Sequence, residues 1–245
     1  MEAGEYAKMR ALEDRYWWFV GRRALARSLV RLAVAPTEKP DLLDLGCGPG
    51  ALLSEVAGET NSTGADFSAL ALEFCRERGI ARLACADAQA MPFAARSFDV
   101  VTALDILEHV EDDDAAFDEI FRVLRPGGAL VISVPAFRWL WGPHDMALHH
   151  FRRYTRHQVE ERLRDAGFTV ERLSYAVFLL FPFVIVSRIV EKFRKGPAKA
   201  SLPAVPDWTN AFLIRLLSLE SRLVASGVRL PWGSSVVALA RKPGA

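Results

Sequence analysis

The chain has 245 residues, of which 51% are hydrophobic and 25% are charged, and its formal net charge is +1. This length and composition fit one globular core with room for an insertion, and they exclude disordered and fibrous chains. A net charge near zero argues against nucleic acid as a partner, because nucleic-acid-binding proteins carry a clear basic excess. We therefore expect an enzyme that acts on small molecules.

The order of the predicted elements indicates an α/β fold. Residues 1–36 form a predicted N-terminal helical cap, because apolar side chains recur there at helical spacing until Pro36. Beyond it, strand and helix patterns alternate, which predicts a parallel sheet with helices on both faces. Strands are expected at 41–45, 63–66, 81–86, 98–104, 129–134, 168–174 and 234–241, and helices at 51–57, 69–78, 112–123, 156–166 and 210–225.

A glycine-rich turn follows the first predicted strand. Residues 44–50 read Asp-Leu-Gly-Cys-Gly-Pro-Gly. Missing Cβ atoms let a ligand lie against the backbone, and the helix that starts next offers free N–H groups. The spacing Gly46-x-Gly48-x-x-Ala51, with Asp66 twenty residues after Gly46, also satisfies the dinucleotide fingerprint. An NAD-dependent oxidoreductase is therefore one reading of the turn.

Three further stretches follow the turn in a fixed order. They are residues 85–93 (Cys-Ala-Asp-Ala-Gln-Ala-Met-Pro-Phe), 97–101 (Ser-Phe-Asp-Val-Val) and 124–132 (Leu-Arg-Pro-Gly-Gly-Ala-Leu-Val-Ile). With the turn, they resemble the class I S-adenosylmethionine-dependent methyltransferases, particularly the type 11 group of small-molecule enzymes. The resemblance implies a Rossmann-like sheet of seven strands in the order 3-2-1-4-5-7-6, with S-adenosyl-L-methionine as cofactor and S-adenosyl-L-homocysteine as product.

The resemblance also implies which residues bind the cofactor. Asp44 and the turn would hold its methionine portion, Asp66 its ribose hydroxyls, and Asp87 its adenine amino group, with Ala88 offering a backbone N–H. Arg22 is the candidate for its carboxylate. The full predicted cofactor set is Arg22, Asp44, Gly46, Cys47, Gly48, Gly50, Asp66, Phe67, Asp87 and Ala88.

Two segments are candidates for the acceptor site. Residues 105–109, Asp-Ile-Leu-Glu-His, look like the Glu-x-x-Glu-His pattern of ubiquinone-pathway O-methyltransferases, which can hold a divalent ion. Asp105 replaces the first glutamate, and we predict no metal here. Asp105 falls near the transferred methyl by the resemblance. His109 is a candidate substrate-binding residue, with a structural hydrogen bond as the alternative.

The second segment, residues 141–155, contains His-Asp and then His-His-Phe-Arg-Arg-Tyr. It resembles bacterial type 11 enzymes that also begin with Trp-Trp-Phe-x-x-Arg-Arg, matched here at residues 17–23. His149 stands where a small residue is expected. His144 and His150 are chemically suited as bases, because a hydroxyl acceptor must lose its proton. The predicted substrate-binding residues are Trp17, His109, Arg152, Arg153 and Tyr154, and the alternative for them is ion pairing and packing.

About sixty residues separate the last two predicted strands. We expect a core at 37–175, a helical insertion or lid at 176–230, and a final strand of the core at 231–245. The apolar run at 177–186 is too short to span a bilayer, which needs about 20 residues. Two readings stay open: a helix buried as core or lid, and peripheral membrane contact or lipid binding through 177–195.

Three cysteines, Cys47, Cys75 and Cys85, lack the paired spacing of a zinc site and predict a reducing cytoplasm without disulfides. The predicted function is O-methylation of a small or lipid-like metabolite. The alternatives are the oxidoreductase and a non-catalytic module that binds S-adenosylmethionine. Nothing in the residues predicts the oligomeric state.

Overall fold

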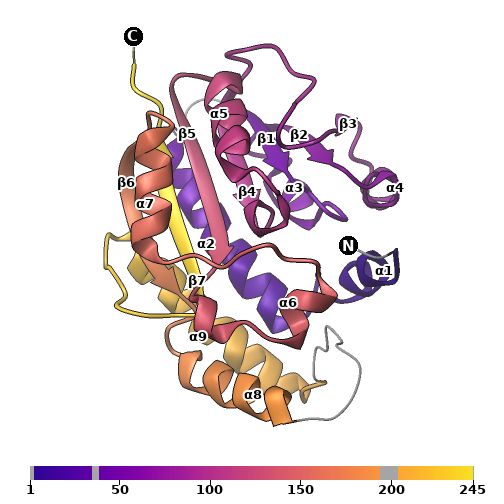
Figure 1. The fold of residues 1–245 in the computed structure, drawn as a ribbon. Coiled ribbons are helices and arrows are strands. Elements are labelled where there is room, and N and C mark those ends of the chain that lie inside the picture. The colour runs from indigo at the N-terminus through magenta and orange to yellow at the C-terminus, as the bar shows by residue number, and fades with distance from the viewer. Residues whose placement is uncertain (1–2, 35–38, 194–203, 245) are drawn as a thin grey trace.

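A seven-stranded sheet forms the centre of the computed structural model, which describes residues 3–34, 39–193 and 204–244 (Figure 1). The strand order is β3-β2-β1-β4-β5-β7-β6, as the resemblance predicts. All neighbouring strands are parallel except β7, which runs antiparallel to β5 and β6. The strands are β1 (Asp41–Leu45), β2 (Asn61–Asp66), β3 (Leu83–Cys85), β4 (Phe98–Leu104), β5 (Leu124–Pro135), β6 (Thr169–Ala176) and β7 (Ser235–Arg241).

Helices cover both faces of this sheet. They are α1 (Ala3–Leu12), α2 (Trp17–Ala33), α3 (Ala51–Val56), α4 (Ala69–Glu77), α5 (Asp113–Val123), α6 (Pro143–Ala147), α7 (Arg156–Asp165), α8 (Phe181–Phe193) and α9 (Asp207–Ala225), with short 3₁₀ turns η1 (Leu107–His109) and η2 (Arg138–Leu140). Apolar residues of α5 and α7 pack on one face, and those of α2, α3 and α4 pack on the other.

The central strands β1 and β4 are rich in apolar residues because both of their faces are buried, and their buried polar residues are Asp44 and Thr102. Neighbouring residues of a strand point to opposite faces, so Leu43 joins the α5–α7 core while Leu42 joins the α2–α4 core. β5 begins at Leu124, five residues before the predicted strand, and its pairing with β4 is irregular in this first part. The remaining strand and helix predictions differ from the structure by a few residues at their ends.

Local capping fixes where two functionally placed helices begin. The Asp112 side chain accepts the N–H of Ala115 at 3.1 Å and starts α5. Thr155 and Gln158 form a capping box at the start of α7. Both helices thus begin beside the loops that carry the histidines.

The segment between β6 and β7 contains α8 and α9, at the lower edge of Figure 1. Leu217 of α9 packs with Val177 and Leu180, which directly precede α8. Among the described helices, none is both long enough and apolar enough to cross a membrane.

Candidate active site

A cavity of about 880 Å³ begins at the carboxyl ends of β1 and β2 and extends to α8 and α9. Its lining includes Gly48 and Asp66 at one end, His150 in the middle, and Val184 and Leu217 at the other. In open α/β sheets, ligands bind at this edge, where the strand order reverses. The cavity therefore joins the predicted cofactor and acceptor sites in one space.

The glycine turn is shaped by backbone contacts that side chains would prevent. Gly46 has φ +72°, and a Cβ there would lie 2.6 Å from Cδ1 of Ile106. At Gly48, with φ +52°, the nearest atom to a Cβ would be Sδ of Met9 at 3.4 Å. The N–H groups of Gly46 and Cys47 are both bonded to the carbonyl of Ala65. The turn lines the cavity beside Met9 of α1, which belongs to the same lining.

Two carboxylates flank the turn. Asp44 is buried and accepts the hydroxyl of Thr102 at 2.6 Å, and its burial raises its pKa to about 7. Asp66 accepts the N–H groups of Gly48 at 2.9 Å and Ser68 at 2.8 Å. A cofactor with a positively charged amino-acid end and a ribose diol fits these two carboxylates. A carboxylate attracts a cationic amino group and accepts hydrogen bonds from two neighbouring hydroxyls.

Sequence analysis missed Tyr6, which closes this end of the cavity. Its hydroxyl donates to Oδ1 of Asp66 at 3.2 Å from helix α1. Burial and the Asp66 charge raise the pKa of Tyr6, so the phenol keeps its proton. Nothing in the local sequence marks this contact, because the two residues are 60 positions apart.

The residues predicted for the adenine end lie together. Phe67, Asp87 and Ala88 all line the cavity. Phe67 is largely exposed, and Asp87 accepts the backbone N–H of Gln89 at 2.9 Å. The Gln89 side-chain amide also donates to both oxygens of Asp87, at 3.2 and 3.5 Å. An exposed ring beside this carboxylate suits a flat, hydrogen-bonding base.

Arg22, predicted for the cofactor carboxylate, lies against Asp105 instead. Its Nη2 is 2.5 Å from Oδ1 of Asp105 and 2.6 Å from Oγ of Ser133, and its guanidinium covers the ring of Trp18 at 5.1 Å. Asp105 has φ +54°, a strained conformation of the kind that gathers at functional sites. The structure thus gives Arg22 an ion pair at the centre of the cavity, and its binding to the cofactor stays a prediction.

Asp145 organises the histidine loop from the first turn of α6. Fully buried, it accepts Nδ1 of His150 at 2.9 Å and Nε and Nη2 of Arg153 at 2.8 and 3.0 Å. Burial opposes its ionisation, but the hydrogen bonds from His150 and Arg153 hold the pKa of Asp145 well below its usual range. Because Asp145 accepts from Nδ1, the lone pair of His150 is on Nε2.

The other histidines border the same space. His144 lines the cavity, and burial together with the charge of Arg188 lowers its pKa to about 4. The ring of His109 meets that of His150 edge to face, with centroids 4.6 Å apart. Burial and the neighbouring His150 lower the pKa of His109 to about 3. His149 has φ +57°, which explains why a small residue is expected there.

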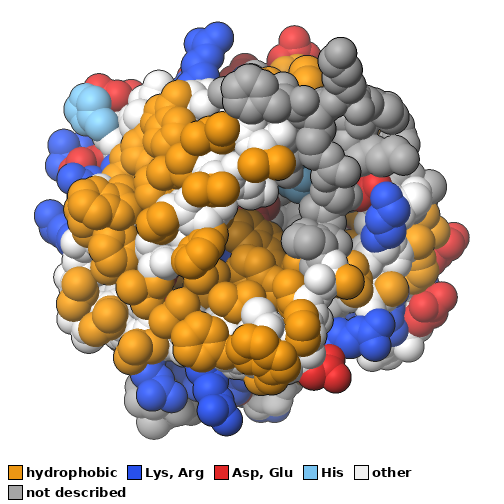
Figure 2. All heavy atoms as spheres, turned by 90° about the horizontal axis from the view of Figure 1, so that it is seen from below, with side chains coloured by type: hydrophobic (Ala, Val, Ile, Leu, Met, Phe, Trp, Pro, Cys, Tyr) orange, Lys and Arg blue, Asp and Glu red, His pale blue; other side chains and the backbone are white. Residues whose placement is uncertain are grey.

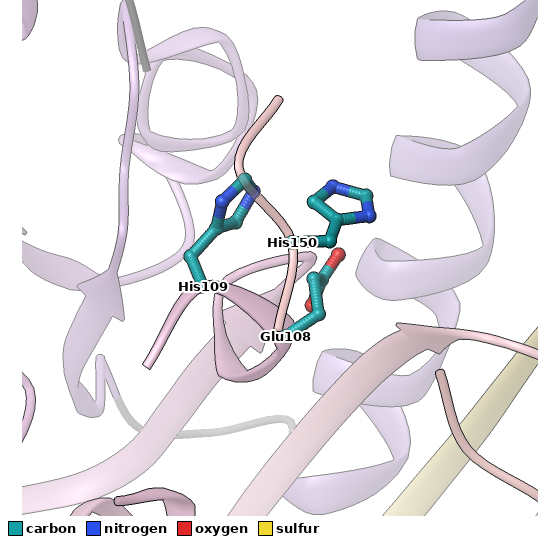
Figure 3. A group of neighbouring side chains, drawn as sticks. All are labelled: Glu108, His109 and His150. Carbon is teal, nitrogen blue, oxygen red and sulfur yellow. The ribbon is translucent and has the colours of Figure 1, made fainter. Parts of the chain in front are cut away.

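Glu108, His109 and His150 lie close together (Figure 3). One potential ligand atom of each lies within 4.8 Å of the other two. Glu108 is buried, and its Oε2 has no hydrogen-bond partner within the described parts of the chain. Burial and the charge of Asp105 raise its pKa well above the usual range. The residue that the resemblance adds to this group, Asp105, is held by Arg22.

Three residues predicted to bind substrate have structural partners instead. Arg152 pairs with Asp113, and the buried hydroxyl of Tyr154 donates to the same carboxylate at 2.8 Å. Trp17 packs beside Leu217, while its neighbour Trp18 lines the cavity. These contacts are the ion pairing and packing expected in the alternative. Trp17, Arg152 and Tyr154 are not among the residues that line the cavity, and their role in substrate binding stays a prediction.

Comparison with known proteins agrees with this geometry. Residues 43–132 match the family described as a methyltransferase domain. The demethylmenaquinone methyltransferase of Mycobacterium marinum is 40% identical over 121 residues, which are 49% of this chain and 48% of that protein. The chain spans less than half the length of this relative and of the other curated relatives it matches first.

Two solved structures share the fold. A chain of the complex between the Haloferax volcanii Trm112 methyltransferase activator and a methyltransferase superposes with a TM-score of 0.63 at 22% identity, over 99% of this chain and 96% of that one. Phosphoethanolamine N-methyltransferase 2 of Haemonchus contortus, in complex with S-adenosyl-L-methionine, gives 0.58 at 20% identity, over 89% and 52%. Residues 43–132 therefore match a methyltransferase domain, and the chain has the fold of the class I S-adenosylmethionine-dependent methyltransferases.

Proposed function

We propose that this protein transfers the methyl group of S-adenosylmethionine to a hydroxyl of a small or lipid-like acceptor and releases S-adenosylhomocysteine. The observation that carries the proposal is the single cavity that joins the glycine turn to the Asp145–His150 pair. Such a space lets an acceptor atom meet the methyl carbon in line, and positioning of this kind supplies most of the acceleration.

The cofactor would lie along the turn, with its methionine end beside Asp44 and its ribose on Asp66. It supplies an electrophilic methyl group on a sulfonium. The chain's own part is to fix that group: Asp66 is already oriented by two backbone N–H groups, and Gly48 lets the ligand approach the backbone. The ion pair of Arg22 and Asp105 borders the point where the two halves of the cavity meet.

His150 is the proposed base. A hydroxyl acceptor keeps its proton at neutral pH and must lose it as the methyl moves. Asp145 holds the ring with Nε2 free to accept that proton, and it stabilises the resulting imidazolium. His144, whose pKa is lowered to about 4, stays neutral at physiological pH and contributes the second imidazole of the wall.

The far half of the cavity suits an acceptor with an apolar chain and an anionic group. Val177, Val184 and Leu217 line it, and Arg188 is the cation among them. Guanidinium groups bind phosphate and carboxylate well. The relative named for demethylmenaquinone is consistent with a lipid-like acceptor, although its name applies to that protein alone.

The first test is transfer of labelled methyl from S-adenosylmethionine into an extract of the source cells, partitioned between organic and aqueous phases. We expect label in the organic phase, absent with heat-killed protein. Label confined to the aqueous phase would overturn the lipid-like acceptor. No label at all, with cofactor binding intact, would favour the non-catalytic binding module.

The oxidoreductase alternative is tested by melting temperature. A ligand that binds only the folded state raises the melting temperature with its concentration. We expect S-adenosylmethionine and S-adenosylhomocysteine to do so and NAD to have no effect. The reverse result would overturn the proposal.

A further inference from the structure

Helices α8 and α9 present apolar side chains to the outside of the molecule. On α8, Phe183, Val186, Ile189 and Val190 form one stripe, and on α9 Trp208, Phe212 and Leu219 form another; these side chains are 51–75% exposed. Figure 2 shows this end of the molecule, with hydrophobic side chains spread over most of the visible face and a hollow near its centre. We call the two stripes the apolar face.

An apolar face of this kind needs an occupant. Scattered exposed hydrophobic residues are normal, but a contiguous patch on a globular protein marks an interaction surface. Residues 183, 186 and 189/190 of α8 are spaced by three or four, and residues 208, 212 and 219 of α9 by four and seven, so each set lies on one side of its helix, opposite the side that faces the protein. The inner side of α9 is filled by Leu217 and Val224, which are buried.

The charges on these helices select the occupant. Arg215 of α9 is exposed and stands within its stripe, whereas residues 181–190 and 208–219 contain no acidic residue, and the exposed acid nearest to the α9 stripe is Asp207 at the start of the helix. The next acid on α9, Glu220, is buried and accepts the backbone N–H groups of Val177 and Leu179. In the sequence, residues 188–199 hold five basic residues and one acidic residue. Stripes that carry a positive charge and no negative charge between their apolar residues complement an anionic amphiphilic surface.

We propose that the apolar face docks on an anionic lipid bilayer. The two helices lie in the plane of the interface, with their apolar stripes at the boundary of headgroups and acyl chains and Arg215 at the phosphates. A second copy of this chain fits less well, because a two-fold contact through this face would bring like-charged arginines together in an apolar setting. Val184 and Leu217, from the same helices, line the cavity, so its mouth lies beside the membrane.

The experiment is co-sedimentation with extruded vesicles, in the absence of cofactor and acceptor, so that its result does not depend on the proposed reaction. We expect binding to vesicles of phosphatidylcholine mixed with phosphatidylglycerol, and at least about tenfold weaker binding to phosphatidylcholine alone. Raised salt should weaken the binding, because it screens the arginines.

Substitutions locate the surface. Phe183→Ser combined with Trp208→Ser should weaken vesicle binding at least about tenfold, and Arg215→Gln should reduce the preference for anionic vesicles. Leu32→Ser is the matched control: Leu32 is also an exposed apolar residue, at 46%, but lies near the end of α2 beside Ala33, whose carbonyl accepts Arg241 at the opposite edge of the molecule. It should bind vesicles as the unchanged protein does.

Three results would overturn the proposal. These are binding that the double substitution leaves unchanged, equal binding to both kinds of vesicle, and a dimer in sedimentation equilibrium that the double substitution dissociates. Affinity for S-adenosylhomocysteine, measured on every variant, shows that each is folded. Because all substituted side chains are exposed, this affinity should stay the same.

Discussion

Oδ1 of Asp145 lies 2.9 Å from Nδ1 of His150, and the same carboxylate is held by the buried guanidinium of Arg153. One ionised side chain thus fixes an imidazole and balances a buried cation at the same time. Substitutions of His150 and of Asp145 test these two functions separately.

Replacing His150 with Ala should lower kcat at least about a hundredfold, because general-base catalysis contributes about 10²–10⁴. Cofactor affinity should be unchanged, since His150 lies beyond the cofactor end of the cavity. Single-turnover methyl transfer and calorimetric titration with S-adenosylhomocysteine measure the two quantities. His144→Ala is the comparison variant, and its loss should be smaller. Unchanged turnover in His150→Ala would remove His150 as the base.

Replacing Asp145 with Asn should reduce both turnover and stability. The neutral amide leaves Arg153 buried without a counter-charge, and breaking one partner of a buried ion pair costs about 3–5 kcal/mol. Denaturant unfolding measures this loss. The variant Asp145→Asn with Arg153→Met removes both charges and should recover much of the stability but little of the turnover. Equal recovery of both would show that Asp145 acts only in packing.

Cofactor affinity should rise with pH, because Asp44 must ionise to face a cationic ligand. Its pKa is raised to about 7 by burial, so below that pH the carboxyl is neutral and binding must expel a proton. Titrations on both sides of pH 7, in buffers of different ionisation enthalpy, measure the affinity and the released proton. Asp44→Asn should bind more weakly and show no such pH dependence.

The same shift predicts the stability of the free protein. A carboxyl whose folded pKa is raised stabilises the fold fully below its ordinary pKa, and this contribution is lost as the pH rises to about 7. Asp44→Asn should remove that decline from the pH dependence of the melting temperature. A decline of the same size in Asp44→Asn would assign it to other groups.

Gly46→Ala should destabilise the protein more than Gly79→Ala does. Both glycines have positive φ, at +72° and +78°, so both substitutions carry the cost of about 1–2 kcal/mol for a left-handed residue. Only the Cβ at position 46 meets other atoms, those of Ile106, which adds about 1–3 kcal/mol for overpacking. Gly46→Ala should also lose cofactor affinity. Equal unfolding free energies for the two variants would contradict the close contact.

Activity should not require a divalent ion. Glu108 has a raised pKa and is uncharged when protonated, whereas a metal ligand must be ionised. Chelation with EDTA should therefore leave the initial rate unchanged. Loss of activity, followed by recovery with Mn²⁺ or Zn²⁺, would contradict this prediction and point to Glu108, His109 and His150.

The sequence predicted the sheet well, and the residues that it predicted for the cofactor, among them Asp44, Gly48 and Asp66, line one cavity, because both signals are local; their binding to the cofactor stays a prediction. The glycine turn lies within residues 44–50, and Asp66 ends the next predicted strand. The strand order followed from the four sequence motifs, which occur in the order and at the separations typical of the family that the chain resembles. The pairings of Arg22 with Asp105 and of Tyr6 with Asp66 join residues 83 and 60 positions apart. Such contacts depend on how helices α1 and α2 pack against the folded sheet, which local sequence patterns do not determine.

The same limit explains the choice between neighbouring aromatic residues. Trp17 and Trp18 follow one another on α2, and consecutive residues of a helix point about 100° apart. Which of them would line the cavity depends on the rotation of the helix, and that rotation is set partly by Gly21, whose missing Cβ allows Leu217 to approach. The spacing of residues along the chain does not predict this contact, because Gly21 and Leu217 are far apart in the sequence.

The hydrogen bond from Tyr6 to Asp66 has a consequence for the rates of cofactor binding and product release. The phenol occupies an oxygen that the ribose diol is expected to use, so α1 and the nucleoside compete for one acceptor. We therefore expect cofactor entry to begin with release of the phenol, and its return to assist product exit. Tyr6→Phe should speed association of S-adenosylhomocysteine and slow its dissociation, because the competing donor is lost; stopped-flow binding measures both rates, and unchanged rates would show that Tyr6 does not control nucleoside exchange.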